Sequence, residues 1–200
     1  MQVGPETVTE GDADRAYAAC VERATRHTWR MGHIVLIGLM GSGKTTVGAA
    51  LAAALGVPHR DSDADIERDT GLTGRQRAAR DGIDALHVLE ARHLLDSLAE
   101  PGTSVISPAA SVLDEPECRS ALRDPRHLVV WLAASPADLA ARLRPDDHRP
   151  AIDPDMAEVL ERQAVQRNQA LREVADLTLD ATKPPAELID AIRTHADAVR

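Results

Sequence analysis

Aromatic residues and cysteines are scarce in this chain. Its 200 residues include no Phe, one Tyr and two Trp, so a core must be built from Leu, Val, Ile and Ala. A nucleic-acid enzyme gains little support from this composition, because aromatic side chains commonly provide the surfaces on which bases stack. The two cysteines, Cys20 and Cys118, lie far apart, and the eight histidines form no H-x-x-x-H pair. We therefore expect no disulfide or zinc framework, and a reducing cellular interior.

Long apolar runs and an excess of positive charge are also lacking. No stretch approaches the roughly 20 apolar residues of a membrane span, and the acidic start lacks the basic-then-apolar order of a signal peptide. The 32 acidic and 23 basic side chains give a net charge of -9, which argues against nucleic-acid or acidic-membrane partners. With a length suited to one α/β domain, these absences predict a cytoplasmic protein, which we expect to be monomeric.

Residues 38–45 form the most informative motif that is present. They read Gly-Leu-Met-Gly-Ser-Gly-Lys-Thr, a complete G-x-x-x-x-G-K-[ST] phosphate loop between an apolar strand pattern and a helical pattern. The glycines let the backbone wrap a phosphate, and the following helix presents its positive end to the same anion. Lys44 is expected to reach the outer phosphates of ATP, and Thr45 to bind Mg²⁺ through its hydroxyl. The sequence therefore predicts a nucleoside-triphosphate site.

Strand and helix patterns alternate after a separate N-terminal segment. In residues 1–31, small apolar residues recur at helical spacing, so we expect an extension with one weak helix, either an appendage or a docking element for a partner.

Residues 32–200 are expected to form one kinase-sized domain with a mostly parallel sheet. The predicted strands are 33–37, 57–60, 103–107, 127–132 and 176–180. The predicted helices are 44–55, 64–69, 75–80, 83–98, 115–123, 136–143, 155–173 and 185–198.

Candidate site residues follow the predicted strands. Ligands of open parallel sheets bind beyond the carboxyl ends of the strands, which points to residues 61–63, residues 107–111 and the turn after Leu132. The segment 142–152 is polar, basic and interrupted by prolines. We expect it to be a lid whose arginines screen phosphate charge, and the alternative is a solvated loop.

Several of these motifs together resemble the shikimate kinase family, from about residue 33 to residue 195. The loop and its tail read GLMGSGKTTVG, and Asp61-Ser62-Asp63 stands where the family has Asp-x-Asp after the second strand. Further similar positions are Ile66-Glu67, Thr70-Gly71, Glu90, Arg149-Pro150 and Arg167. The resemblance implies an α/β three-layer P-loop kinase fold, with a five-stranded mostly parallel sheet, helices on both faces and a lid at about 142–152.

The resemblance also implies roles for particular residues. Asp61 is expected to hold a Mg²⁺ water, and Asp63, two positions on along an extended strand end, to accept a hydrogen bond from the attacking hydroxyl or act as base. The implied catalytic residues are Lys44, Asp63 and Arg149, and the implied metal ligands are Thr45 and Asp61. The implied nucleotide-binding residues are Gly38, Gly41, Ser42, Gly43, Lys44, Thr45, Thr46, Arg142 and Lys183. The implied acceptor-binding residues are Asp63, His87, Ala109, Ala110, Ser111 and Arg167, with Arg167 paired to the acceptor's carboxylate.

Three departures from the family pattern concern the acceptor half. His87 stands where the family has an arginine that grips the substrate carboxylate, and an imidazole cannot make that two-pronged contact. Ala109-Ala110-Ser111, preceded by Pro108, aligns with a glycine triplet, so this loop is expected to differ in shape or to hold the alcohol in another way. His59-Arg60 replaces apolar residues, so the second strand is expected to be less buried or re-registered.

Three functions remain open for these residues. The leading one is transfer of the γ-phosphoryl group of ATP to a hydroxyl of shikimate or a related small polyol acid. The others are a kinase for another acceptor, such as a gluconate-type sugar acid, and a degenerate nucleotide-binding protein without catalysis. For Asp61 and Asp63 the structural alternative is a simple N-capping turn. Acceptor-dependent ADP release separates a kinase from a binding protein.

Overall fold

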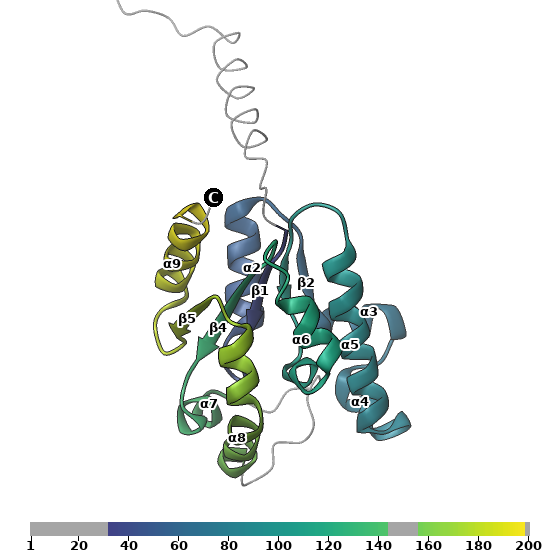
Figure 1. Ribbon diagram of the computed structural model, residues 1–200. Coiled ribbons are helices and arrows are strands. Elements are labelled where there is room, and N and C mark those ends of the chain that lie inside the picture. Colours follow the sequence, from purple (N-terminus) through teal and green to yellow (C-terminus); the bar gives the residue numbers. More distant parts are fainter. Residues whose placement is uncertain (1–31, 144–155, 199–200) are drawn as a thin grey trace, which may run out of the picture. The chain divides into compact units, whose positions relative to one another are not determined.

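The computed structural model describes residues 32–143 and 156–198 (Figure 1). The predicted N-terminal extension therefore lies outside the described residues. So does the predicted lid from residue 144 to residue 152, including Arg149. Within the described ranges, no helix combines the length and the apolar composition needed to cross a membrane.

The centre of the fold is a five-stranded sheet in the order β2-β3-β1-β4-β5. All four strand pairings are parallel, so the predicted sheet is confirmed and is parallel throughout. β1 lies in the middle, which places the phosphate loop that follows it at the centre of the carboxyl edge of the sheet. The strands are β1 (Ile34–Ile37), β2 (His59–Asp61), β3 (Val105–Ser107), β4 (Leu128–Ala133) and β5 (Leu177–Asp180).

Helices cover both faces of the sheet, as predicted (Figure 1). α2 and α9 contact each other and form one layer, because α2 packs on β1 and β3. α5, α6 and α8 form the opposite layer, where their buried residues share a core with Val35 and Ile37 of β1. The helices are α2 (Lys44–Leu55), α3 (Ser62–Thr70), α4 (Gly74–Asp81), α5 (Ile83–Ala99), α6 (Pro116–Leu122), α7 (Pro136–Arg142), α8 (Met156–Val174) and α9 (Pro185–Ala198).

The core is aliphatic, as the composition requires. Alternate residues of a strand point to opposite faces, so Ile34 and Leu36 face the α2 layer while Val35 and Ile37 face the α5 layer. All four are at most 2% exposed, which is typical of a parallel strand covered on both sides. Cys118 is buried in the same core as Val35 and Ile37, so it packs as a small apolar residue.

Edge strand β2 differs from the central strands β1 and β4 because it carries mainly polar side chains. His59 is half-buried, and its Nε2 lies 2.9 Å from Ser107 Oγ of β3. Arg60 forms a bidentate ion pair with Glu100, through Nη2 and Nε. The expectation of a less buried second strand is thus met, and β2 still pairs in parallel with β3.

Candidate active site

A cavity of about 840 Å³ lies at the carboxyl edge of the sheet. Its walls come from the segments after β1, β2, β3 and β5, together with residues of α5, α7 and α8. Most of the predicted site residues line this one cavity. They are Gly41, Ser42, Gly43, Lys44, Thr45, Thr46, Asp61, Asp63, His87, Ala109, Ala110, Ser111, Arg142, Arg167 and Lys183.

The phosphate loop depends on glycine for its backbone shape. Gly41 and Gly43 have φ angles of 84° and 90°, which side chains of L-residues rarely adopt. A Cβ atom at Gly41 would also lie 2.8 Å from the carbonyl oxygen of Leu139. Gly38 does not line the cavity, and a Cβ atom there would lie 2.7 Å from the carbonyl oxygen of Leu132. Gly38 therefore lets the loop pass close to β4, while the other two shape the loop itself.

Helix α2 begins directly after this loop and presents an anion site. Gly43 is its N-cap and has no side chain that could hydrogen-bond to the first backbone N–H groups. Uncapped N–H groups and the helix dipole together favour a bound anion. Lys44 Nζ donates to the carbonyl oxygens of Gly38 and Leu39 at 3.0 and 3.3 Å, so its ammonium lies against the loop. Thr45 and Thr46 are exposed and line the cavity.

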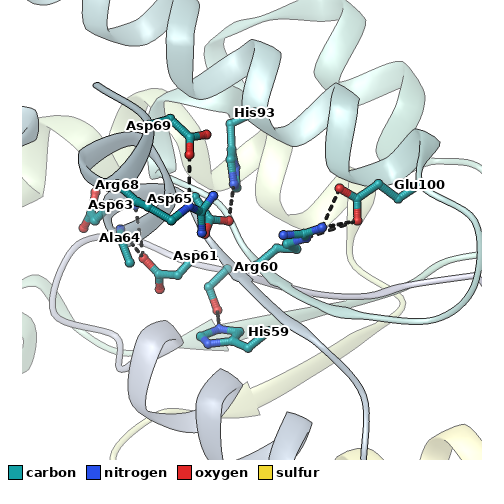
Figure 2. A network of polar contacts seen from close by, with 11 residues as sticks. His59, Arg60, Asp61, Asp63, Ala64, Asp65, Arg68, Asp69, His93 and Glu100 are labelled. Atoms are coloured by element: carbon teal, nitrogen blue, oxygen red, sulfur yellow. Dashed lines mark hydrogen bonds and ion pairs between the residues drawn. The ribbon is translucent and has the colours of Figure 1, made fainter. Parts of the chain in front are cut away.

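Asp61 combines a capping role with an oxygen that is suited to a cation. It ends β2 and caps α3, because its Oδ1 accepts hydrogen bonds from the backbone N–H groups of Asp63 (3.1 Å) and Ala64 (3.5 Å) (Figure 2). Its Oδ2 is buried and has no hydrogen-bond partner among the described residues. A buried oxygen without a partner is costly, and a cation or its water would satisfy it. The N-capping turn is therefore real, and it leaves one oxygen for Mg²⁺.

Asp63 lies on a helix, so the expected extended strand end is wrong. Helix α3 starts at Ser62, immediately after Asp61, because the Asp61 cap initiates the helix at that point. Asp63 is in the first turn and lines the cavity. α3 is held against α5 by Asp65, whose Oδ2 lies 2.8 Å from His93 Nε2 (Figure 2). This contact fixes the helix that carries Asp63.

Glu90 is a buried carboxyl group in the wall of the cavity. It is 7% exposed, and Ser111 Oγ donates a short hydrogen bond to its Oε2. Burial raises the pKa of Glu90 to about 7; the Ser111 hydrogen bond opposes this shift and the nearby Asp63 charge adds to it. His87 lies one turn before Glu90 on α5 and lines the same cavity. Glu90 is therefore partly protonated at neutral pH.

Arg167 lies on α8 with its guanidinium in an ion pair. Its Nε atom is 3.0 and 3.1 Å from the two carboxylate oxygens of Asp114, and its Nη2 also bonds Oδ2. The Arg167 side chain is 9% exposed and the Asp114 side chain is 27% exposed. Arg167 reaches the cavity wall as predicted, and Asp114 is a partner that the sequence did not reveal.

The loop aligned with the glycine triplet has an ordinary backbone. Ala109 is extended, with φ -61° and ψ 153°, and a short 3₁₀ helix, η1, follows over Ala110–Asp114. No non-glycine residue of the described chain has a positive φ angle. The loop therefore has a shape that alanine tolerates, and Pro108, Ala109, Ala110 and Ser111 all line the cavity.

Two groups of site residues were missed or misplaced by the sequence analysis. The turn after Leu132 does not line the cavity, whereas residues 181–185, after β5, do, and of these only Lys183 was predicted. The rule about carboxyl ends of strands, applied to the predicted strand 176–180, would have included them. Gln163 carries no local signal, because only the packing of α8 brings it to the cavity wall. Asp114, at the end of η1, is connected to the cavity through its ion pair with Arg167.

Comparison with known proteins agrees with this geometry. A family model described as Shikimate kinase matches residues 40–196. Shikimate kinase 2 of Sodalis glossinidius is 34% identical over 165 residues, which cover 80% of this chain and 92% of that protein. Shikimate kinase of Ralstonia nicotianae is also 34% identical over 165 residues, covering 81% and 85%.

A solved structure gives the same result in three dimensions. The shikimate kinase of Acinetobacter baumannii in complex with shikimate superposes with a TM-score of 0.81 and 27% identity, covering 88% of this chain and 98% of that chain. The family model spans the phosphate loop from Met40 onward, strands β2 to β5, and the cavity walls on α3, α5 and α8. The chain belongs to the shikimate kinase family and is an ATP-dependent small-molecule kinase.

Proposed function

We propose that this kinase transfers the γ-phosphoryl group of ATP to a hydroxyl of shikimate. The observation that carries the proposal is a single cavity lined both by the phosphate loop and by Asp63, Glu90 and Arg167. A kinase needs both reactants in one cavity, because positioning and electrostatics supply most of the catalysis of phosphoryl transfer. The similarity to a protein solved with shikimate supports this acceptor.

The nucleotide is assigned to the phosphate-loop end. The backbone N–H groups of Gly41, Ser42 and Gly43, with the uncapped start of α2, would receive the phosphates. Arg142 and Lys183 would bind along the nucleotide, because Arg142 Nη1 donates to the carbonyl oxygen of Ala181 (2.8 Å) and both side chains line that wall. Gly38 contributes by letting the loop lie against β4, and Thr46 lines the same end.

Thr45 and Asp61 are the residues assigned to Mg²⁺. The buried Asp61 Oδ2, which has no partner within the described ranges, and the exposed Thr45 hydroxyl would supply the oxygen ligands that this hard cation prefers. When bound, Mg²⁺ neutralises charge on the β- and γ-phosphates. The cap formed by Asp61 Oδ1 holds the carboxylate in position for this task.

The chemical step is assigned to Asp63 and Lys44. Asp63 would accept the proton of the acceptor hydroxyl while the oxygen of that hydroxyl forms a bond to the γ-phosphorus of ATP. The bond between the γ-phosphorus and the oxygen that bridges it to the β-phosphate breaks, and ADP leaves. Lys44 would offset the charge on the transferred group. The resemblance gives Arg149 the same task, and this residue lies outside the described part of the chain.

The acceptor is assigned to the opposite wall of the cavity. Arg167 would face its carboxylate, and Ser111, His87, Ala109 and Ala110 would line the space for its ring. Only Arg167 of these residues carries a permanent positive charge.

The test is an ADP-release assay with shikimate, quinate and gluconate as acceptors. Wild type should release ADP with shikimate well above the acceptor-free rate, and Lys44→Ala should fall to the blank. Arg92→Ala is the matched control, since it removes a positive charge that is 79% exposed on α5 and outside the cavity. ATP binding without stimulation by any acceptor would favour the non-catalytic alternative. Stimulation by gluconate alone would favour the other kinase alternative.

A further inference from the structure

The described residues at the acceptor end of the cavity provide little uncompensated positive charge. Among the described lining residues, Lys and Arg occur at four positions: Lys44, Arg142, Arg167 and Lys183. Lys44 lies on the phosphate loop, and Arg142 bonds the segment after β5 that also carries Lys183. Of the described residues, Arg167 is thus the cation that the acceptor end can offer to a carboxylate.

The charge of Arg167 is already shared with Asp114. The contact is side-on and uses Nε and Nη2 together, which is the strong two-pronged geometry of arginine and carboxylate. Gln166 Nε2 also donates to Asp114 Oδ1 at 3.2 Å, which helps to hold the carboxylate in place. The pair is largely buried, so it is weakly screened by solvent.

Other carboxyl groups add to this effect. Glu90 and Asp63 line the same cavity, and their charges interact. His87, at the position where the resemblance implies an arginine, offers no fork for a carboxylate. An acidic acceptor that enters this end therefore meets two nearby carboxyl groups and a guanidinium that is already paired.

We propose that Asp114 is a specificity-determining residue, because its ion pair with Arg167 competes with the carboxylate of the acceptor. Asp114 weakens the binding of acidic acceptors relative to uncharged ones of the same shape. This inference rests on the proposed function, since it concerns the acceptor end of the same reaction.

The wild-type enzyme gives the first test, with shikimate and its uncharged methyl ester as acceptors. If Asp114 competes, the KM of shikimate should be less than about threefold below the KM of the ester, because the carboxylate gains little from a paired arginine. A larger advantage for shikimate would overturn the inference. This comparison needs no variant, so it holds even if substitution of Asp114 prevents folding.

The second test is Asp114→Asn, which keeps the shape and removes the charge. The KM of shikimate should fall by about tenfold, while the KM values of the ester and of ATP stay within about twofold. Glu115→Gln is the matched control: it removes an exposed charge one position away and should change none of these values. A larger effect of shikimate on the melting temperature of Asp114→Asn than of wild type would be a second supporting result.

A rise in the KM of shikimate in Asp114→Asn would contradict the inference. If Asp114 only positions Arg167, Asp114→Asn should raise the KM of shikimate, and the inference is then wrong. An unchanged KM would also contradict it. If wild type released ADP no faster than the Lys44→Ala blank with shikimate or its ester, the proposed function itself would be wrong. This result is distinct from a failure of the Asp114 inference, in which wild type is active but the KM values do not change as expected.

Discussion

The two ends of the cavity are built from different parts of the chain. At the phosphate-loop end, the contact groups are backbone N–H groups and a helix start, supported by glycines at residues 41 and 43. At the acceptor end, the polar groups are side chains from different helices, among them Glu90 and Arg167, each with a polar side-chain partner. A backbone site is fixed by local sequence, whereas a side-chain site can change its charge with a single substitution far along the chain.

The largest effect is expected at the junction of the two ends. Asp63→Asn should lower kcat by about 100-fold or more, because the group that takes the hydroxyl proton is lost. The KM for ATP should change little. Steady-state ADP release with saturating shikimate measures this.

The control for this variant is Asp69→Asn on the same helix. Asp69 is 64% exposed and pairs with Arg68, so this substitution should leave kcat unchanged. Equal losses in both variants would mean that α3 tolerates no change of charge, and that Asp63 has no special part in the chemistry.

At the phosphate-loop end, Gly41→Ala should weaken ATP binding by about 10-fold. The added Cβ atom is strained at φ 84° and lies 2.8 Å from the Leu139 carbonyl oxygen, so the loop must shift. The strain alone is worth about 1–2 kcal/mol. Titration with ATP or the KM for ATP reports the change.

Gly71→Ala is the control for Gly41→Ala, because it introduces backbone strain at a positive φ angle outside the cavity. Gly71 has φ 70° and open space around its Cα, and it caps α3 away from the cavity lining. This variant should lose about 1 kcal/mol of unfolding free energy and keep its KM for ATP. A similar loss of ATP affinity in both variants would point to general destabilisation.

At the acceptor end, the KM of shikimate should rise by roughly three- to tenfold between pH 6 and pH 8. Burial raises the pKa of Glu90 to about 7, so Glu90 loses its proton in this range and then repels the acceptor's carboxylate. Glu90→Gln should flatten the profile, while Glu161→Gln, on the exposed face of α8, should not. A wild-type KM that is constant with pH would contradict this assignment.

The raised pKa of Glu90 also predicts how the free energy of unfolding depends on pH. The folded protein holds the Glu90 proton more tightly than the unfolded chain, whose pKa is near 4.5. The free energy of unfolding therefore falls as pH rises from about 4.5 to about 7, and this contribution is absent in Glu90→Gln. Urea unfolding of both proteins at pH 5 and pH 8 measures the difference.

The smallest effect is expected between the two ends, at Ser107. Its Oγ donates to the Lys44 carbonyl oxygen at 3.1 Å and lies 2.9 Å from His59 Nε2. Ser107→Ala should cost about 1 kcal/mol of unfolding free energy, the net value of a typical hydrogen bond, with a change in kcat of less than about twofold. Ser120→Ala, at an exposed position of α6, should change neither.

Much of the fold follows from local patterns. The strand predicted at 33–37 is β1, and the helix predicted at 44–55 has the observed bounds, because the apolar runs and the glycine loop mark them in sequence. The strand predicted at 57–60 lies instead at His59–Asp61. Its polar residues are stabilised by contacts such as His59 with Ser107, 48 positions away, which no local pattern contains.

The residues of the site likewise fall into those that local sequence predicts and those that only tertiary packing reveals. The phosphate loop could be predicted from its motif, and Asp61 from its place after the second strand together with the family resemblance. The helical setting of Asp63 depends on the cap formed by Asp61, and the wrong expectation followed from extending the strand by two residues. The pair of Arg167 and Asp114 spans 53 positions and the pair of Glu90 and Ser111 spans 21, so only tertiary packing reveals them.

Gly48 on α2 lies where the helix packs closely against side chains of strands β2 and β3. A Cβ atom there would lie 2.5 Å from His59 Nε2 and 2.5 Å from Ser107 Oγ, so the absent side chain is what admits the imidazole of β2. Positions 48 and 59 therefore form an epistatic pair, in which the tolerance of one residue is conditional on the other. An alanine at 48 would require the His59 and Ser107 side chains to move or to be replaced by smaller ones, so the residues that position 48 tolerates depend on what stands at 59 and 107.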